Sequence, residues 1–288
     1  RTSAYDYRIS NRGGKGVTSM DLKRGSGFTR VVSTIPVIGT DQLVMVSDGG
    51  QLIRLPVSGI SFTGAGYLDG DTLSPSPVFT SGLTGTYSAL TLGASNRYAA
   101  TLSAEGVGLL RQGAGVTVVD ARPGLIAPSL DRLNYVWSVP RSAPTELLAI
   151  ASDGTSNKVA VPFAATSITA LEVSHDGTRV AILYTEGTTD RLIVATVLRG
   201  ENGVPQRLGS SVSLALPSGT PVDIAWVDNT TVAALSTQGA VSSVLTTVVG
   251  GRSQSYASFI AGTAASMAGG NNLSQLRILA TDGRLYAL

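Results

Sequence analysis

The sequence predicts an all-β protein, a β-propeller built from four-stranded antiparallel blades. Short runs rich in Val, Ile, Leu and Thr alternate with turn clusters along most of the chain. Asp-Gly pairs, which suit tight turns with positive φ, recur between those runs. The runs group into units spaced by about 35 to 48 residues, which is the repeat length of propeller blades. Together these observations favour repeated antiparallel sheet over any helical fold.

The clearest unit spans Ser167–Arg199 and serves as the template for the others. Two turn clusters, one holding Asp176-Gly177 and one at Glu186–Thr189, divide it into three runs of strand-forming residues. A fourth strand is expected near Val204–Leu216. The unit is therefore an up-and-down meander of four strands.

Weaker copies precede the template. We expect a hairpin at Gln42–Leu55 and a long loop or irregular outer strand at Ser61–Gly85, which is rich in Gly, Ser, Thr and Pro. Two further units then lead to the template. Their strands are expected at Ser88–Leu92, Arg97–Leu102, Val107–Arg111, Val116–Val119, Tyr135–Val139, Leu147–Ala151 and Val159–Val161.

Two units follow the template, and the last of them is one strand short. The strands are expected at Asp223–Val227, Thr231–Leu235, Val241–Val249, Gln254–Phe259, Ala264–Met267, Leu276–Ala280 and Arg284–Tyr286. We therefore expect six blades, with five to seven allowed by the spacing, in one domain over residues 1–288. Residues 1–30 are expected to be partly linker, or to supply the strand that closes the ring and removes an exposed sheet edge. A pair of β-sandwiches is the alternative architecture.

Composition excludes several classes of protein. Charged residues make up only 14% of the chain and hydrophobic ones 43%, so extended disorder is not expected. The net charge is +2 and no basic stripe stands out, so we expect no nucleic-acid partner. Without Cys the chain has no disulfide and no thiol nucleophile. Arg1–Ser10 lacks the apolar core of a signal peptide, so the chain is expected to be a mature or trimmed piece.

No catalytic, cofactor-binding or metal-binding residue is predicted. Ser174-His175-Asp176 holds the residue types of a hydrolase triad, but consecutive residues at a turn cannot converge as a triad must. His175 is therefore expected to be a solvated turn residue. The acidic turn at 69–71 lacks the Glu that a calcium loop would place near position 80. Trp137 and Trp226 lie in strand-like runs and are expected in the core rather than on a sugar-binding platform.

The template also carries a family resemblance. The segment 173–181, Val-Ser-His-Asp-Gly-Thr-Arg-Val-Ala, resembles the V-S-x-D-G-x-R-V-A signature of the LpqB-type actinobacterial lipoproteins. Three further segments and the chain ending agree with that family in the same order. These are Val194–Arg199, Arg207–Gly209, Asp223–Val227 and Thr281–Tyr286. The resemblance covers mainly Leu171–Leu288, and the first half of the chain agrees in architecture more than in motif.

The resemblance implies a function. The resemblance implies a three-part organisation for the full-length protein: a lipidated N-terminal Cys, a GerMN-type domain and a β-propeller. This chain would correspond to the propeller alone. The resemblance also implies a non-enzymatic, extracytoplasmic interaction module that modulates a two-component sensor kinase of the MtrA–MtrB type and cell-envelope homeostasis. The implied partner is the extracytoplasmic domain of that kinase. The implied location is the outer face of the membrane, through a lipid anchor outside this chain, and we expect a monomer without cofactor.

Two other functions stay open. A propeller hydrolase or lactonase would need acidic or His residues that converge on the central channel. A cell-wall glycan-binding module would need exposed aromatic residues in a groove, and aromatic residues make up 6% of the chain. The sequence leaves open which end of the propeller binds a partner, because Ser174–Gly177 and Glu186–Thr189 lie at opposite ends of the template unit.

Overall fold

The computed structural model describes residues 87–93, 97–111 and 115–288, together with four short strands nearer the N-terminus. Two of these strands, β1 (Gln42–Val46) and β2 (Leu52–Pro56), form the antiparallel hairpin predicted from the sequence. The other two, β3 (Tyr67–Leu68) and β4 (Pro75–Ser76), pair within the stretch that was expected to be irregular. The expected ring-closing strand or linker at residues 1–30 lies outside the described residues.

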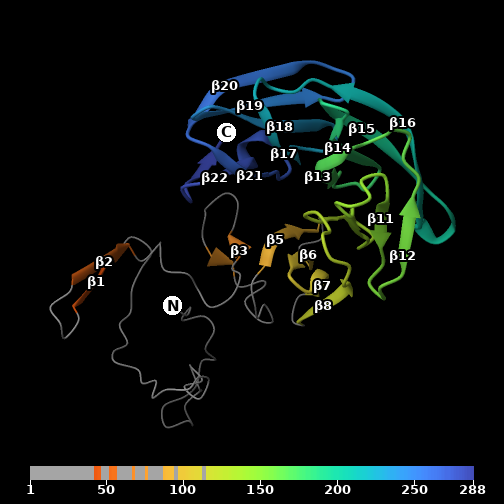
Figure 1. Cartoon of the computed structure of the whole chain (residues 1–288), viewed down its shortest axis with the longest axis horizontal. Helices are drawn as coiled ribbons and strands as arrows, with labels where there is room; N and C mark the ends of the chain where they lie inside the picture. The colour runs from red at the N-terminus through yellow and green to blue at the C-terminus, as the bar shows by residue number, and fades with distance from the viewer. Residues whose placement is uncertain are drawn as a thin grey trace, which may run out of the picture.

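Five antiparallel sheets form the blades, and we number them in chain order. Their inner strands lie toward the middle of Figure 1 and their last strands on the outside. Blade 1 holds β5 (Tyr87–Leu92), β6 (Tyr98–Ser103), β7 (Gly106–Arg111) and β8 (Val116–Asp120). Blade 2 holds β9 (Ser129–Leu130), β10 (Val136–Ser138), β11 (Leu147–Ile150) and β12 (Ser156–Val159).

The remaining blades contain the longest strands. Blade 3 holds β13 (Ser167–Val173), β14 (Arg179–Glu186), β15 (Thr189–Arg199) and β16 (Pro205–Leu214). Blade 4 holds β17 (Thr220–Trp226), β18 (Thr231–Gln238), β19 (Val241–Val248) and β20 (Ser253–Ala261). Blade 5 has three strands, β21 (Ala264–Ala268), β22 (Arg277–Ala280) and β23 (Leu285–Ala287).

The propeller prediction is confirmed, and the five described blades fall within the expected range of five to seven. Short 3-10 turns at Glu201–Gly203 and Leu273–Gln275 are the helical elements among the described residues, and none of them could span a membrane. One strand was placed wrongly. The outer strand of blade 2 is Ser156–Val159 rather than 159–161, because the turn at Asp153-Gly154 fixes the register of the strand that follows.

The Asp-Gly turns have the predicted conformation. Gly154, Gly177 and Gly283 have φ values of 85°, 71° and 84°, which glycine adopts without a Cβ penalty. In each turn the preceding aspartate accepts a hydrogen bond from the backbone N–H two residues after itself, at 2.8 to 3.0 Å. The aspartate thus fixes the turn and the glycine permits it.

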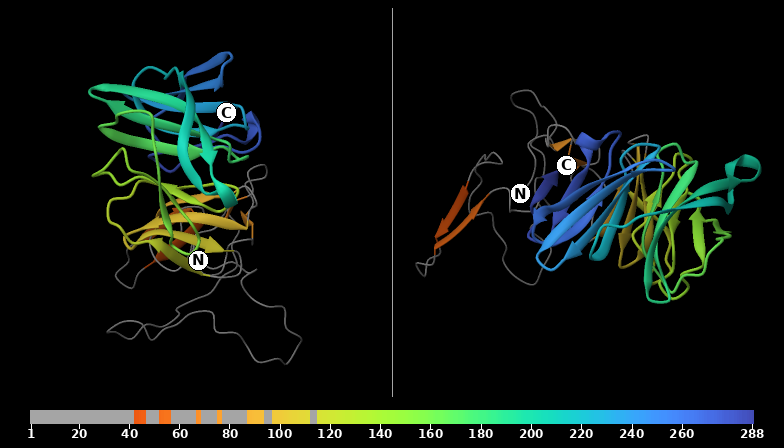
Figure 2. Two further views of the ribbon diagram at one scale, coloured as in Figure 1. Left: turned by 90° about the vertical axis from the view of Figure 1, so that its right-hand side faces the viewer. Right: turned by 90° about the horizontal axis from the view of Figure 1, so that it is seen from above.

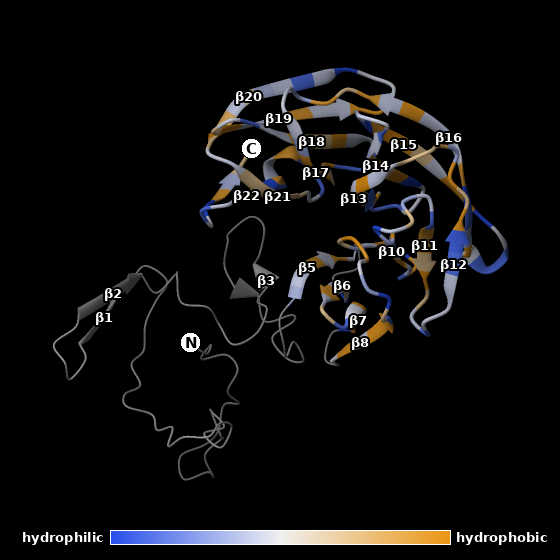
Figure 3. Cartoon of the chain, viewed as in Figure 1, coloured by the Kyte–Doolittle hydropathy of each residue, from blue (hydrophilic) through white to orange (hydrophobic). Residues whose placement is uncertain are grey.

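The core lies between the blades, and neighbouring sheets pack face to face (Figure 2). In β14, the side chains of Val180, Ile182 and Tyr184 face blade 2, and those of Ala181 and Leu183 face blade 4. Both faces of this strand are therefore buried, which explains its unbroken apolar sequence. The outer strand β12, by contrast, is hydrophilic (Figure 3).

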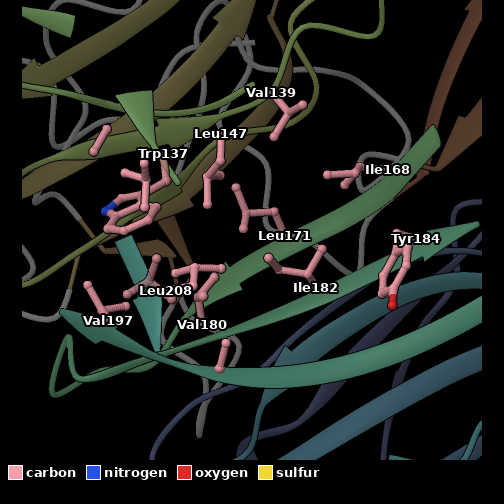
Figure 4. Close-up of a cluster of buried hydrophobic side chains, with 14 of the residues drawn as sticks. Trp137, Val139, Leu147, Ile168, Leu171, Val180, Ile182, Tyr184, Val197 and Leu208 are labelled. Carbon is pink, nitrogen blue, oxygen red and sulfur yellow. The ribbon is translucent and has the colours of Figure 1, made fainter. Parts of the chain in front are cut away.

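The interface between blades 2 and 3 is the largest apolar cluster. Figure 4 shows side chains from both sheets meeting there, with Trp137 at one end and Tyr184 at the other. The ring of Tyr184 stacks on Phe163 with a centroid distance of 4.5 Å. Trp137 is 0% exposed, so its predicted place in the core is confirmed.

A buried ion pair links blades 2 and 3 across this interface. The Asp131 carboxylate, from the first turn of blade 2, accepts a hydrogen bond of 2.7 Å from Arg199 at the end of β15. Its oxygens also accept bonds from the Trp137 indole N–H and from the backbone N–H groups of residues 133 and 135. The Arg199 guanidinium in turn donates to the carbonyl oxygens of Gly177 and Gly203. Because the buried carboxylate is fully hydrogen-bonded, it tolerates its loss of solvent.

We predict that Asp131→Asn strongly destabilises the fold, because it leaves the Arg199 charge without a counterion. The expected loss in the free energy of unfolding is about 3 kcal/mol, measured by urea titration. The matched control is Glu186→Gln, which removes the carboxylate of an exposed pair with Arg191 and should cost less than about 1 kcal/mol. Equal losses in the two variants would contradict a fastening role for Asp131.

Candidate functional site

The inner strands of the blades surround a central cavity of about 630 Å³. Its wall is formed by residues of β5, β13, β17 and β21, together with Leu130 of β9 and the two residues at 127–128. Neighbouring inner strands contact one another around this wall. The cavity therefore lies on the channel side of the propeller, and small-molecule sites often occupy the mouths of such β-architectures.

The same irregularity shapes four of the inner strands. The pairing register of β5, β13, β17 and β21 with the next strand slips by one residue near the start of each inner strand. The residues skipped by the slips are Ser88, Thr169, Val222 and Ala265, and all four line the cavity. A bulge of this kind bends a strand and redirects its side chains. The repeated bulge therefore sets which residues of each inner strand face the channel.

Glu172 lies in β13 and lines the cavity. It interrupts the apolar run 170–173 of this strand and is partly buried. Its Oε2 accepts a hydrogen bond of 3.2 Å from the Ser129 hydroxyl of blade 2, and that hydroxyl accepts a bond of 2.9 Å from the backbone N–H of Val173. The Glu172 carbonyl oxygen accepts the indole N–H of Trp226 from blade 4 at 2.9 Å. The residue therefore connects three blades.

Asp223 lies in β17, the neighbouring inner strand, and also lines the cavity. Its Oδ1 accepts the backbone N–H of Ile224 at 2.9 Å. Its Oδ2 accepts the backbone N–H of Met267, in the inner strand of blade 5, at 2.7 Å. Asp223 thus joins blades 4 and 5 in the way that Ser129 and Glu172 join blades 2 and 3.

The two carboxyl groups hold protons more tightly than usual. Burial raises the pKa of Glu172 to about 8, and the nearby Asp223 charge adds to the increase against the opposing Ser129 hydrogen bond. Burial also raises the pKa of Asp223 to about 6, although the N–H groups of Met267 and Ile224 favour its ionised form. Both carboxyl groups are thus poised to change charge near neutral pH.

The triad-like segment is a turn, as expected. The Ser174 hydroxyl donates to Asp176 Oδ1 at 2.6 Å and accepts the backbone N–H of Arg179 at 3.0 Å, so both side chains serve the turn. His175 is partly exposed and also lines the cavity. His175 therefore lies in a partly exposed turn, as predicted, and this turn also borders the channel.

The sequence analysis missed both channel carboxylates. Glu172 and Asp223 each interrupt an apolar inner-strand run, and that interruption was the available signal. Trp226 was placed correctly, because it is 2% exposed and packs between blades 3 and 4. Among the described residues, no three His, Asp or Glu side chains lie close enough together to hold a metal ion. The acidic turn at 69–71 lies outside the described residues.

Comparison with known families agrees with the fold. The model of the lipoprotein LpqB β-propeller domain matches residues 39–286. The chain belongs to this family. The resemblance seen in the segment 173–181 thus extends over most of the sequence, including the first half where motifs were sparse.

A second comparison concerns the N-terminal residues. The model of the DNA gyrase C-terminal β-propeller domain matches residues 1–36. A DNA gyrase protein of Granulibacter bethesdensis is 44% identical over 64 residues, which are 22% of this chain and 7% of the gyrase protein. The chain thus spans a small fraction of that relative.

Two solved structures are also similar. TolB from Acinetobacter baumannii shares 14% identity with a TM-score of 0.49, covering 76% of this chain and 57% of TolB. A gluconolactonase from Xanthomonas campestris shares 13% identity with a TM-score of 0.47, covering 69% of this chain and 74% of the enzyme. Neither likeness assigns a function to this chain.

We predict that the channel carboxylates make stability depend on pH. Their folded-state pKa values of about 8 and about 6 lie above the ordinary values of 4.5 and 3.8. The folded chain therefore binds more protons than the unfolded chain, and the free energy of unfolding should fall as pH rises from about 4 to about 8.

Glu172→Gln tests this pH dependence. The neutral amide avoids the cost of a buried charge, so the variant should melt several degrees higher than the wild type at pH 9 and close to it at pH 4, given about 2–4 °C per kcal/mol. The control is Glu105→Gln, which neutralises an exposed carboxylate and should change little. A difference between Glu172→Gln and wild type that is the same at both pH values would contradict the assigned protonation.

Proposed function

We propose that the chain is a non-enzymatic interaction module that binds the extracytoplasmic domain of a sensor histidine kinase of the MtrA–MtrB type and modulates its signalling. The observation that carries the proposal is the match of the LpqB propeller family over residues 39–286. The module would act outside the cytoplasm, held by a lipid anchor that is not part of this chain. It would contribute in this way to cell-envelope homeostasis.

One end of the propeller is the better docking surface. We define the first-turn face as the end that carries the turns between the first and second strands of blades 2, 3 and 4, at residues 131–135, 174–178 and 227–230. Asp176 donates its backbone N–H to Asn229 Oδ1 at 3.0 Å, and Arg179 donates to the Asn229 carbonyl oxygen at 2.7 Å. These bonds connect the turns of blades 3 and 4, as Arg199 connects those of blades 2 and 3. A surface fixed before binding loses less entropy on binding.

Leu133 is the best candidate for a contact residue on this face. Its side chain is 47% exposed and lies beside the exposed Arg132, and interface energy concentrates in such apolar and arginine anchors. The turns between second and third strands lie at the opposite end, where Leu285 follows the turn at 281–284 and is 44% exposed. The two leucines therefore form a matched pair for testing which end binds.

We predict saturable 1:1 binding when the chain is titrated with the extracytoplasmic kinase domain in a calorimeter. Leu133→Asp should weaken the affinity at least tenfold, which corresponds to about 1.4 kcal/mol. The control variant Leu285→Asp should bind like the wild type. If only Leu285→Asp loses binding, the kinase domain contacts the opposite end of the propeller. If the wild type does not bind, the kinase proposal is wrong.

A second candidate function is contact with DNA through the N-terminal residues. It is favoured by the gyrase match at residues 1–36 and by the excess of basic residues in that segment. Residues 1–36 hold seven of the 21 Lys and Arg residues but two of the 19 Asp and Glu residues, which leaves the remaining chain with 14 basic and 17 acidic residues. This basic segment is the part of the chain suited to a phosphate backbone. A DNA partner would place the chain in a different compartment from the kinase.

Fluorescence anisotropy with a labelled linear DNA duplex tests this candidate. If the segment contacts DNA, binding should weaken steeply with salt, and neutralising Lys15, Lys23 and Arg24 to Gln should reduce both the affinity and its salt dependence. The control neutralises three basic residues of the propeller, Lys158, Arg252 and Arg284, and should leave binding unchanged. Absence of binding at low salt, or an equal loss in the control, would eliminate the candidate.

A further inference from the structure

The central cavity holds two carboxyl groups, and its described wall has no cationic side chain of Lys or Arg to balance their charge once they ionise. Glu172 and Asp223 project into it from adjacent inner strands, and no Lys or Arg is among the described residues that line it. The other ionisable group of the wall is His175. Two ionised carboxylates in a partly desolvated space repel one another, so a cation between them would be stabilised by both.

The oxygen atoms of the pair are still able to accept a ligand. Glu172 Oε2 accepts the Ser129 hydroxyl, and each Asp223 oxygen accepts one backbone N–H group. The bond from Ser129 goes to Oε2, which leaves Oε1 as a further acceptor of a residue that lines the cavity. Because each carboxylate oxygen can accept two bonds, a donor in the cavity would find free acceptor sites on both residues.

The rest of the wall includes apolar side chains that could contact the carbon chain of a ligand. Leu90, Ala265 and Ala268 are exposed residues of the wall that supply apolar surface, and Thr91 adds a hydroxyl group. The volume of about 630 Å³ lies within the range of small-molecule sites, which are mostly apolar with a few convergent polar groups. Calcium fits the cavity poorly, because it requires six or more oxygen ligands and the described wall offers two carboxylates.

We propose that the central cavity binds a small organic cation, a protonated alkyl amine whose ammonium group lies between Glu172 and Asp223 and whose carbon chain contacts the apolar wall. This inference is independent of the kinase proposal, because it concerns the channel and not the first-turn face. It assigns the two carboxyl groups a ligand-binding role in addition to the hydrogen bonds by which they connect the blades.

The test uses the whole chain and 1,4-diaminobutane as the probe. We expect saturable binding by calorimetry and a rise in the melting temperature with added diamine. Both effects should be stronger at pH 9 than at pH 6, because the carboxylates are ionised at the higher pH. The uncharged analogue 1,4-butanediol is the ligand control, and calcium chloride is the control for a metal site.

Glu172→Gln is the decisive variant, because a Gln can still accept the Ser129 hydrogen bond and should not harm folding. Its affinity for the diamine should be at least tenfold weaker than that of the wild type. Asp223→Asn should also weaken binding. This variant is the less clean test, because Asn has one oxygen and can keep only one of the two backbone hydrogen bonds that Asp223 accepts. Asp282→Asn, which removes an exposed carboxylate far from the channel, should bind as the wild type does.

Four outcomes would overturn the proposal. These are no binding of the diamine, equal binding of the diol, equal binding by Glu172→Gln, and stabilisation by calcium without stabilisation by the diamine. Loss of kinase binding in Leu133→Asp would not bear on it, so the two proposals fail separately.

Discussion

The fold depends on one constraint, which is that the sheets of the middle blades bury both faces. β14 supplies Val180 and Ile182 to one neighbour and Ala181 to the other, and β18 does the same with its Val and Ala residues. An isolated blade would expose both apolar faces to water, so the blades are stable only in a row. This is why β14 and β18 each hold an unbroken apolar run, whereas the outer strand β12 is mostly polar.

Apolar packing alone would let neighbouring blades slide past one another, and polar bonds between the blades fix their alignment. Asp131 and Arg199 join blades 2 and 3 near the first-turn face, Asn229 joins blades 3 and 4, and Asp223 joins blades 4 and 5. Hydrogen bonds need defined geometry, which apolar contacts do not. The bonds of Asp131 and Asn229 connect the turns of the first-turn face, and the bond of Asp223 places one of the two channel carboxylates.

The channel and the first-turn face give the propeller two surfaces with different chemistry. Under the two proposals, the face would bind a protein domain, and the channel carboxyl groups would bind a small cation once they are ionised. Membership of the LpqB propeller family supports the first use, and the geometry of Glu172 and Asp223 supports the second. Residues 1–36, which match the gyrase propeller model, are basic. In the rest of the chain acidic residues outnumber basic ones.

The sequence by itself determined the strand meanders, the Asp-Gly turns at Gly154, Gly177 and Gly283 and the core position of both Trp residues. These features follow from local patterns, namely runs of strand-forming residues and turn pairs between them. Only the tertiary structure decided that Glu172 and Asp223 face one cavity and that His175 lines it too. Residues about 50 positions apart meet there because adjacent blades place their inner strands side by side. The bulges at Thr169 and Val222 in the same strands depend on pairing between strands, which sequence periodicity does not encode.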